Sequence, residues 1–475
     1  MNQLLGEKLR THFPAMTIYK DPSSINTIFA GRNLPSFVKD FLIKRYINER
    51  GEIDKGALTD FMNKVIRQDS IKGDLDSGAE LTLLTRFIVD IDLVHNVRRF
   101  SIPDLGIKSS EGQIPKHIYT KYKDVLGEGE MWGIIKICVM PDDNEKTNHV
   151  EMVDFKPFKP YRSVDLSYFA EGRRAFSTSE WIDVLLSAME YDSDGFDSIS
   201  QKLEFLSRLL IFVEPRLNMI ELAPKGTGKS YVFGNLSKYG WMVSGGKVTR
   251  AKLFFDKQKQ RYGIMKDHDF AAFDEIQTIV FQEPMEIQAA LKSYLESGRT
   301  TIDNNEFVSD CGLMLMGNIP LNDMRRPACA KYFDTLPVHF KESALLDRFH
   351  GFIEGWLLPN INTSMIFKGW TFDVEYFSEI MHKLRTSNQY AILYKELVKT
   401  EPNAYIRDCT AVQRLAVAYM KLLFPHWSSK EDVNYDEFEQ YCLRPAIHRR
   451  AIIREQRHLI DPEVGVEMPE FKVEL

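Results

Sequence analysis

The sequence lacks the features of a membrane-spanning, secreted or strongly basic protein. Its 475 residues contain no apolar run long enough to cross a bilayer, and the first residues, MNQLLGEKLR, lack the pattern of a signal peptide. The 5 cysteines stand apart without CxxC spacing, which predicts reduced thiols in a cytoplasmic protein. With 61 basic and 67 acidic residues, the net charge of −6 gives no overall indication of nucleic acid binding, although a local basic surface is compatible with it.

A glycine-rich segment is the most informative feature that the sequence does contain. Residues 223–230 read APKGTGKS and follow the apolar run LNMIEL at residues 217–222, so a strand leads through glycines towards a helix. Its glycines allow backbone N–H groups to approach a phosphate, Lys229 can reach the β- and γ-phosphates of ATP, and Ser230 can bind Mg²⁺. We therefore predict a nucleotide-binding loop formed by Pro224, Lys225, Gly226, Thr227, Gly228, Lys229 and Ser230. The motif begins with Ala223 instead of glycine, a mild departure because that residue need only be small.

A second motif supports the first. Residues 270–275 read FAAFDE, an apolar strand that ends in two adjacent carboxylates. Asp274 can complete the Mg²⁺ site, and Glu275 is placed to act as the base that polarises the attacking water. The alternative is an ordinary buried strand with a solvated acidic end.

Residues 298–318 predict a hairpin followed by another buried strand. GRTTIDNNEFVSD at residues 298–310 has a polar tip at Asp303, Asn304 and Asn305, and LMLM at residues 313–316 is strand-like. Asn318 comes just after this strand, where its side chain can orient the water against the γ-phosphate. The alternative is an asparagine in a turn before Pro320.

Three arginines are candidates for contacts with the γ-phosphate. Arg348, in LLDRF at residues 345–349, is predicted to act across a subunit boundary as an arginine finger. The alternative is a surface salt bridge from Arg348 to Asp347 or Glu342. Arg407 and Arg414, in a helical lid, are candidates for a second contact from the same subunit, and the sequence does not choose between them.

Basic residues gather in two other places. One set offers a DNA-binding surface and comprises Lys247, Arg250, Lys252 and Arg299. The other set lies on a C-terminal helix and comprises Arg444, His448, Arg449, Arg450, Arg454, Arg457 and His458. Two interpretations are open: this face of the helix is solvated or contacts another subunit, or it faces DNA or nucleotide.

These motifs suggest four regions in an α/β protein. We predict an N-terminal helical region over residues 1–85 and a β-rich domain over residues 86–190, which suggests an oligonucleotide-binding barrel. A P-loop ATPase core over residues 191–365 and a C-terminal helical lid over residues 366–475 follow. Ser177 and Glu180 predict a capping box at the start of the helix that runs to Met189.

The order of these motifs resembles that of AAA+ ATPases with a hairpin before the first sensor, a clade that includes MCM helicases and magnesium chelatase. That resemblance covers about residues 200–460. The whole chain is more closely similar to the BrxL family of Lon-related BREX proteins, through FVKDFLIKRY, LGEGEMWGIIKI, APKGTGKS, FAAFDEIQ, MGNIP, ALLDRFHGFIEGW, AVQRLAVAYMKLLFP and IREQRHLIDPE. The resemblance implies a Mg²⁺- and ATP-dependent ring, hexameric in form, that binds DNA, with duplex the expected form, and acts in phage defence with other BREX components.

Members of this family commonly carry a C-terminal Lon-like domain with a Ser-Lys dyad. This sequence ends at Leu475, shortly after IDPE, so we expect a short form without peptidase activity. An alternative function is a remodelling or scaffold ATPase that acts on other defence proteins; an aromatic pore loop from Phe254, Phe255 and Tyr262 would favour it. A third, an ATPase subunit for a peptidase on a separate chain, has no specific support in the sequence.

Overall fold

The computed structural model forms two compact units. One comprises residues 1–40 and 163–475, and the other residues 41–162. The structure describes residues 3–30, 34–47, 53–65, 71–92, 97–123, 126, 129–141, 148–157, 163–258, 261–303 and 305–474. These units divide the chain elsewhere than at the predicted boundaries of 85 and 190, because the first helix and strand pack within the larger unit and the barrel begins before residue 85.

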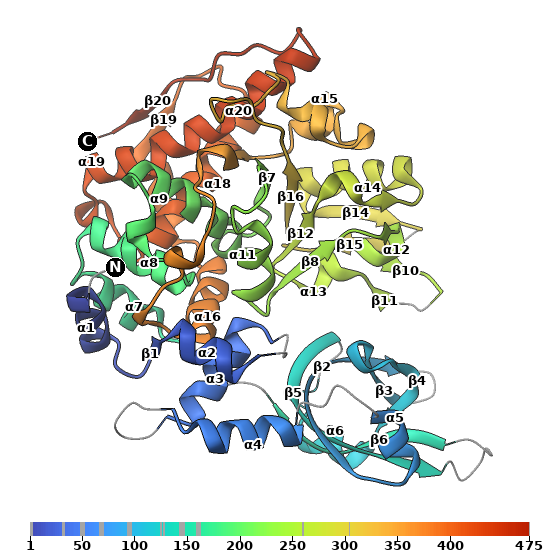
Figure 1. The fold of residues 1–475 in the computed structure, drawn as a ribbon. Coiled ribbons are helices and arrows are strands. Elements are labelled where there is room, and N and C mark those ends of the chain that lie inside the picture. The colour runs from blue at the N-terminus through green and yellow to red at the C-terminus, as the bar shows by residue number, and fades with distance from the viewer. Residues whose placement is uncertain are drawn as a thin grey trace. The chain divides into compact units, whose positions relative to one another are not determined.

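The smaller unit contains a closed five-stranded barrel (Figure 1). Its strands follow one another around the barrel in the order β2-β3-β4-β6-β5, with β4 and β6 parallel and the other neighbours antiparallel. The elements of this unit after the chain enters it are α4 (Lys55–Val65), α5 (Ile71–Asp76), β2 (Leu81–Asp92), β3 (Val97–Ile102), β4 (Ile107–Ile114), α6 (Lys116–Lys121), β5 (Gly129–Pro141) and β6 (Asn148–Pro157). Alternating side chains fill the interior, as Phe87, Val89 and Phe100 illustrate with no exposed surface.

A five-stranded parallel sheet forms the centre of the larger unit (Figure 1). The strand order is β17-β7-β16-β12-β8, where the strands are β7 (Asn218–Ala223), β8 (Gly240–Ser244), β12 (Phe270–Asp274), β16 (Gly312–Asn318) and β17 (Gly351–Glu354). Their near-continuous apolar sequences are typical of parallel strands with both faces covered. All five carboxyl ends meet at one edge of the sheet, which brings the segments after β7, β12 and β16 together.

Helices cover the sheet and extend the unit beyond it. They include α8 (Thr178–Ala188), α9 (Ile199–Leu206), α10 (Leu210–Val213), α11 (Lys229–Asn235), α14 (Pro284–Ser297), α15 (Ser343–Leu346), α16 (Val374–Arg385), α17 (Gln389–Leu397), α18 (Ile406–Leu423) and α20 (Arg444–Ile460). The predicted capping box of Ser177 and Glu180 is confirmed at the start of α8. Among the described residues, no helix combines the length and the apolar composition needed to cross a membrane.

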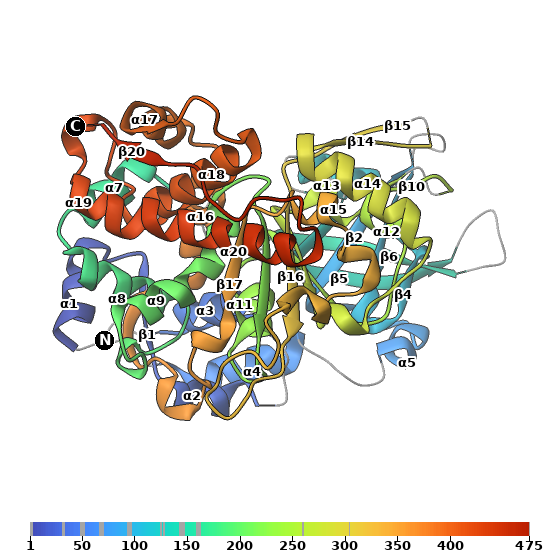
Figure 2. The same ribbon diagram turned by 90° about the horizontal axis from the view of Figure 1, so that it is seen from above.

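Helix α20 runs beside α18 and β17 (Figure 2). This packing buries much of the charge of α20. Arg449, Arg450 and Arg457 are only 3%, 0% and 8% exposed. Their carboxylate partners come from elsewhere in the unit and are Glu204, Asp347 and Asp408. The predictions that these three arginines lie on a solvated face or face DNA were therefore wrong, because buried carboxylates compensate their charge within the chain.

The N-terminal segment is integrated into the larger unit and leads into the smaller one. Strand β1 (Thr17–Lys20) pairs antiparallel with β18 (Gly369–Phe372). Helix α3 (Ser36–Arg45) then begins in the larger unit and crosses the boundary after Asp40. Its first residue is fixed to the core, because the hydroxyls of Ser36 and Tyr231 are hydrogen bonded at 2.8 Å.

Candidate nucleotide-binding site

The predicted phosphate-binding loop connects the end of β7 to the start of α11. Gly226 and Gly228 have φ angles of 83° and 78°, in the left-handed region that favours glycine. A Cβ atom at Gly228 would also lie 2.6 Å from the hydroxyl of Tyr191, whereas the space beside Gly226 is open. The loop thus has a backbone conformation that favours glycine at both positions, and Tyr191 packs against it at Gly228.

Lys229, the first residue of α11, is 8% exposed. Its ammonium group lies 3.4 Å from the carbonyl oxygen of Ala223, 3.3 Å from that of Pro224 and 3.3 Å from Oδ1 of Asn318. Burial lowers the pKa of Lys229, while the nearby carboxylate of Glu221 acts in the opposite direction. A buried cation surrounded by neutral oxygen atoms is well suited to receive an anionic phosphate.

Ser230 and Asp274 meet beside this lysine. The Ser230 hydroxyl donates a hydrogen bond of 2.5 Å to Oδ2 of Asp274, which ends strand β12 and is 6% exposed. Mg²⁺ in nucleotide sites commonly takes few protein oxygens and completes its shell with phosphates and water. One hydroxyl and one carboxylate fit that pattern, and no cluster of three His, Cys, Asp or Glu side chains with metal-site geometry occurs in the described part of the chain.

Glu275 follows directly and has a strained backbone. Its φ angle is 49°, in the left-handed region, and its N–H donates to Oδ1 of Asp274 at 2.9 Å. The side chain is exposed and therefore directed away from the core. Backbone strain of this kind is concentrated at functional sites, and here it occurs at an exposed glutamate directly after Asp274.

Asn318 completes the group at the edge of the sheet. It ends strand β16, directly beside Ala223 in the register, and its side chain contacts Lys229. Gln277 holds it from the other side by donating to the Asn318 carbonyl at 2.9 Å. Our sequence analysis did not identify Gln277, although its position two residues after the paired carboxylates is a signal that could have done so.

The arginines occupy the opposite end of the sheet. The backbone N–H of His350 donates to the carbonyl of Asn218, the first residue of β7, so Arg348 lies near the amino end of that strand. A six-residue strand spans about 20 Å, which separates Arg348 from the loop of its own chain. Arg348 therefore cannot complete its own nucleotide site.

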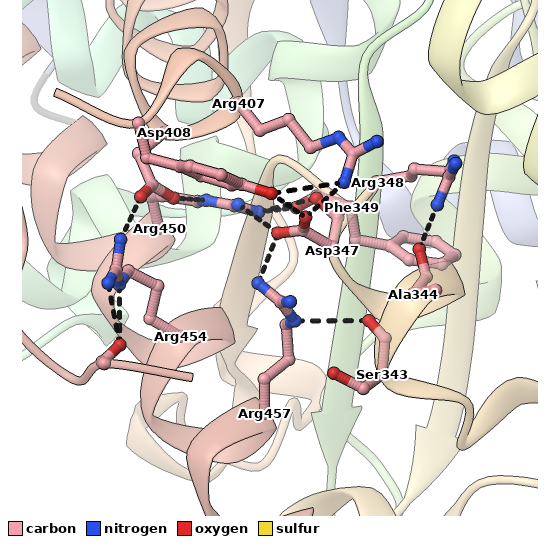
Figure 3. Close-up of polar contacts among 12 residues, drawn as sticks. Ser343, Ala344, Asp347, Arg348, Phe349, Arg407, Asp408, Arg450, Arg454 and Arg457 are labelled. Atoms are coloured by element: carbon pink, nitrogen blue, oxygen red, sulfur yellow. Dashed lines mark hydrogen bonds and ion pairs between the residues drawn. The ribbon is translucent and has the colours of Figure 1, made fainter. Parts of the chain in front are cut away.

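The alternative of a salt bridge from Arg348 to Asp347 or Glu342 is not observed. Nε of Arg348 instead lies 3.0 Å from Oε2 of Glu296, an ion pair without hydrogen-bond geometry. The Arg348 side chain is 16% exposed, and its guanidinium also donates to the carbonyl of Ala344 (Figure 3).

Arg407 and Arg414, the candidates for a second γ-phosphate contact from the same subunit, instead contact oxygen atoms away from the phosphate loop of their own chain. Arg407 binds Asp347 at 2.7 Å (Figure 3). It also lies 2.9 Å from Glu296, the carboxylate that pairs with Arg348. Arg414 donates to the carbonyl of Pro215 at 2.7 Å, just before β7 begins. Both side chains are fixed by oxygen atoms at the amino end of the sheet.

A network of buried charges surrounds Arg407. Asp347, which is 2% exposed, accepts hydrogen bonds from Arg407, Arg450 and Arg457 (Figure 3). These guanidinium groups hold the pKa of Asp347 below its usual value against the effect of burial. The network thereby fixes the segment that carries Arg348.

The basic residues predicted to bind DNA differ in their availability. Arg250 is paired with Glu286 and Asp303 at 3.0 and 2.9 Å, and Arg299 lies 3.7 Å from Glu306. Lys247 and Lys252 are exposed, and neither makes an ion pair within the part of the chain that the structure describes. The predicted hairpin is present as β14 (Arg299–Ile302) and β15 (Asn305–Val308), while Asn304 at its tip lies outside the described residues.

Comparisons with known proteins cover both units of the chain. A family profile described as "Lon-like protease BrxL-like, ATPase domain" matches residues 150–468, and one described as "BREX system Lon protease-like protein BrxL N-terminal" matches residues 11–138. The Lon-like protease BrxL of Escherichia coli O9:H4 (strain HS) is 26% identical over 461 residues, which are 95% of this chain and 64% of that protein. Its counterpart in Bacillus cereus (strain H3081.97) is 27% identical over 463 residues, 95% of this chain and 66% of that protein.

The chain thus spans just under two thirds of the length of these relatives. The ATPase-domain profile covers most of the chain and includes the phosphate loop, the paired carboxylates and Asn318. The family expected from the sequence motifs is confirmed: the chain belongs to the BrxL family and contains its N-terminal and ATPase domains.

Proposed function

We propose that this protein hydrolyses ATP at the carboxyl edge of its parallel sheet and uses that energy to act on DNA in a BREX-type phage defence system. The observation that carries the proposal is the convergence of Lys229, Ser230, Asp274 and Asn318, which come from the start of one helix and the ends of two strands. Membership of a family with an ATPase domain supports the same activity.

Each residue at this edge has a defined task in the proposed reaction. The loop amides and Lys229 bind the phosphates, and Ser230 with Asp274 would hold Mg²⁺. Bound Mg²⁺ supplies positive charge that neutralises the phosphate oxygens as the γ-phosphoryl group is transferred. Glu275 accepts a hydrogen bond from the attacking water and acts as the base, and Asn318 orients the same water.

Catalysis is completed by a second subunit in this proposal. Arg348 lies about 20 Å from its own phosphate loop, which is the arrangement expected for a finger that reaches a neighbour's γ-phosphate. Arg407 contacts the same carboxylate, Glu296, and so joins Arg348 at that interface. A closed ring, with six subunits as the expected number, would give every loop one neighbouring pair of arginines.

The topology supports an AAA+ core and an oligonucleotide-binding barrel. Numbered along the chain, the strands of the sheet have the order 5-1-4-3-2, and the β14–β15 hairpin precedes the fourth of them. The barrel strands have the order 1-2-3-5-4, a closed five-stranded arrangement like that of oligonucleotide-binding folds.

DNA binding is proposed for the exposed lysines Lys247 and Lys252, whose charges are available for phosphate contacts. Arg250 and Arg299 are weaker candidates than the sequence suggested, because acidic side chains already neutralise them. Duplex DNA is the proposed substrate, the cytoplasm the proposed location and other BREX components the proposed protein partners.

The test is the ATPase rate of the full chain with and without duplex DNA, at 2 or more salt concentrations. Stimulation by DNA that decreases as salt rises is the expected result. ATP turnover that ignores DNA at every salt concentration would contradict the DNA role while retaining the ATPase assignment.

A protein-remodelling ATPase is the alternative function. Its aromatic pore loop would depend on Tyr262 alone, which is 44% exposed, because Phe254 and Phe255 are 0% and 7% exposed and belong to the core. Tyr262 packs edge-on against Phe255 with ring centroids 5.4 Å apart. An ATPase stimulated by an unfolded polypeptide and unaffected by DNA would favour this alternative.

A further inference from the structure

A fully buried ion pair lies beneath the phosphate loop. Arg208 and Glu221 have no exposed surface, and two nitrogens of the guanidinium meet two oxygens of the carboxylate at 3.0 and 2.6 Å. Removing two charges from water is costly, and apolar residues of similar size often stabilise a fold as well or better. The pair therefore calls for a role beyond stability.

The third nitrogen of Arg208 binds the phosphate loop itself. Nη1 donates to the carbonyl oxygen of Thr227 at 2.8 Å, and Nη2 lies 3.4 Å from the Thr227 hydroxyl. Thr227 is 1% exposed and stands between the two left-handed glycines of the loop. One guanidinium group thus joins the loop to the strand that precedes it.

This contact determines where a loop amide points. The carbonyl and N–H of one trans peptide point in opposite directions. Because the Thr227 carbonyl is turned inward to Arg208, the N–H of Gly228 is turned away from the buried side. Backbone N–H groups directed outward from such a loop are the groups that bind phosphate.

Glu221 makes this arrangement rigid. It lies in β7, hydrogen bonded between β16 and β17, beside Met316 and Ile353 in the register. Arg208 also lies over the ring of Phe205, with its guanidinium carbon 4.6 Å from the ring centroid. The carboxylate and the aromatic ring together restrict the guanidinium to the orientation in which it contacts Thr227.

We propose that Arg208 is a positioning residue for ATP binding: anchored by Glu221, it holds the Thr227 carbonyl so that the following amide faces the nucleotide phosphates. The inference rests on the proposed function, in which this loop binds ATP. It predicts that a change at Arg208 weakens the binding of ATP and ADP more than that of AMP. ATP and ADP have a β-phosphate that the loop amides can bind, whereas AMP has none.

The test measures the binding of ATP, ADP and AMP to full-length variants, together with their unfolding temperatures. Arg208→Lys keeps a positive charge for Glu221 but cannot contact two carboxylate oxygens and the Thr227 carbonyl at once. We expect it to remain folded, to bind ATP and ADP at least tenfold more weakly than wild type, and to bind AMP within about twofold of wild type.

Arg173→Lys is the matched control. Arg173 is 2% exposed and donates to the carbonyls of Leu423 and Phe176 instead of the loop. We expect this variant to bind ATP like wild type, even if its unfolding temperature decreases. A similar loss of ATP affinity in both lysine variants would overturn the proposal, since it would reflect general destabilisation.

A second variant separates charge burial from loop positioning. The double variant Arg208→Met and Glu221→Met removes both charges, so it should fold about as well as wild type while losing ATP affinity at least tenfold. Wild-type affinity in either this variant or Arg208→Lys would overturn the role of Arg208. Equally weak ATP binding by wild type and Lys229→Ala would instead overturn the proposed function.

Discussion

The ammonium group of Lys229 lies 3.3 Å from the side-chain oxygen of Asn318. One residue comes from the phosphate loop and the other from the end of the adjacent strand, so the contact joins the two side chains that the proposed function assigns to the γ-phosphate and the attacking water. Ser230 is hydrogen bonded to Asp274 beside it, so the proposed nucleotide site would be preorganised before it binds nucleotide. The predictions below follow from this arrangement.

Glu275→Gln is expected to separate binding from turnover. The amide keeps the size of the side chain but cannot act as a base, so ATP should bind with wild-type affinity while hydrolysis decreases about 10²–10⁴-fold. Equilibrium binding and steady-state phosphate release measure the two effects. Glu283→Gln is the control, because Glu283 is also exposed with a left-handed backbone at φ 54°. Turnover at the wild-type rate in Glu275→Gln would remove this residue from the role of base.

A mixing experiment tests whether Arg348 acts between subunits. Lys229→Ala lacks a working loop but retains Arg348, whereas Arg348→Ala retains the loop and lacks the finger. Each variant alone is expected to be about 10³-fold or more impaired, and mixed rings should recover activity where the intact loop meets the intact arginine. Arg444→Ala, which removes an exposed arginine paired with Glu439, should retain full activity. Mixtures as inactive as the separate variants would argue that both groups act in one subunit.

Charge reversal at the exposed lysines tests the DNA surface. The double variant Lys247→Glu and Lys252→Glu should bind every duplex sequence more weakly than wild type. The slope of log binding constant against log salt concentration should become shallower by about one unit for each phosphate that a lysine no longer neutralises. Binding isotherms at several salt concentrations measure this slope. Lys395→Glu, at an exposed lysine of α17, is the control. An unchanged slope in the double variant would locate the DNA-binding surface elsewhere.

Asp347→Asn should destabilise the larger unit. Three arginines donate to this buried carboxylate, and the loss of its charge leaves them uncompensated. A decrease of about 3–5 kcal/mol in unfolding free energy is expected, as for other broken buried ion pairs. Denaturant unfolding measures it, with the exposed Asp436→Asn as control. Unchanged stability would mean that the arginines find other acceptors.

Acid should destabilise the fold through His426. Burial, reinforced by the positive charges of Arg173 and Arg174, lowers the pKa of His426 to about 4 from the usual 6.5. Since the unfolded chain binds the proton more tightly, the contribution of neutral His426 is complete above pH 6.5 and is lost as the pH falls towards 4. Unfolding temperatures between pH 7 and pH 4 should decrease less steeply in His426→Gln than in wild type. The exposed His117→Gln should follow wild type, and identical slopes in all three proteins would contradict this assignment.

Local motifs of the site were predictable from the sequence, whereas its long-range partners were not. The loop at residues 223–230 and the carboxylates after FAAF follow from short patterns with a chemical reason, and the structure brings them together. Arg407 was predicted to contact its own nucleotide because it lies in a helical lid. Its position instead depends on Asp347 and Glu296, acceptors that no periodicity in α18 reveals.

Burial of charge explains the other differences. A helix with as many arginines as α20 is expected to face water or a polyanion, and Arg450 lies inside only because Asp347 and Asp408 approach from other segments. Glu221 is a single acidic residue within the apolar run LNMIEL. Its partner Arg208 lies in a separate turn, so the pair emerges only from the packed fold.

Helix α3 gives the nucleotide site a mechanical connection to the rest of the chain. Tyr231 directly follows the proposed Mg²⁺ ligand Ser230, and its hydroxyl is hydrogen bonded to Ser36, the first residue of α3. The same helix crosses into the barrel-containing unit five residues later, at Phe41. A displacement of the first turn of α11 would therefore either break this hydrogen bond or shift the first residue of α3, so occupancy of the proposed nucleotide site could be transmitted along this helix.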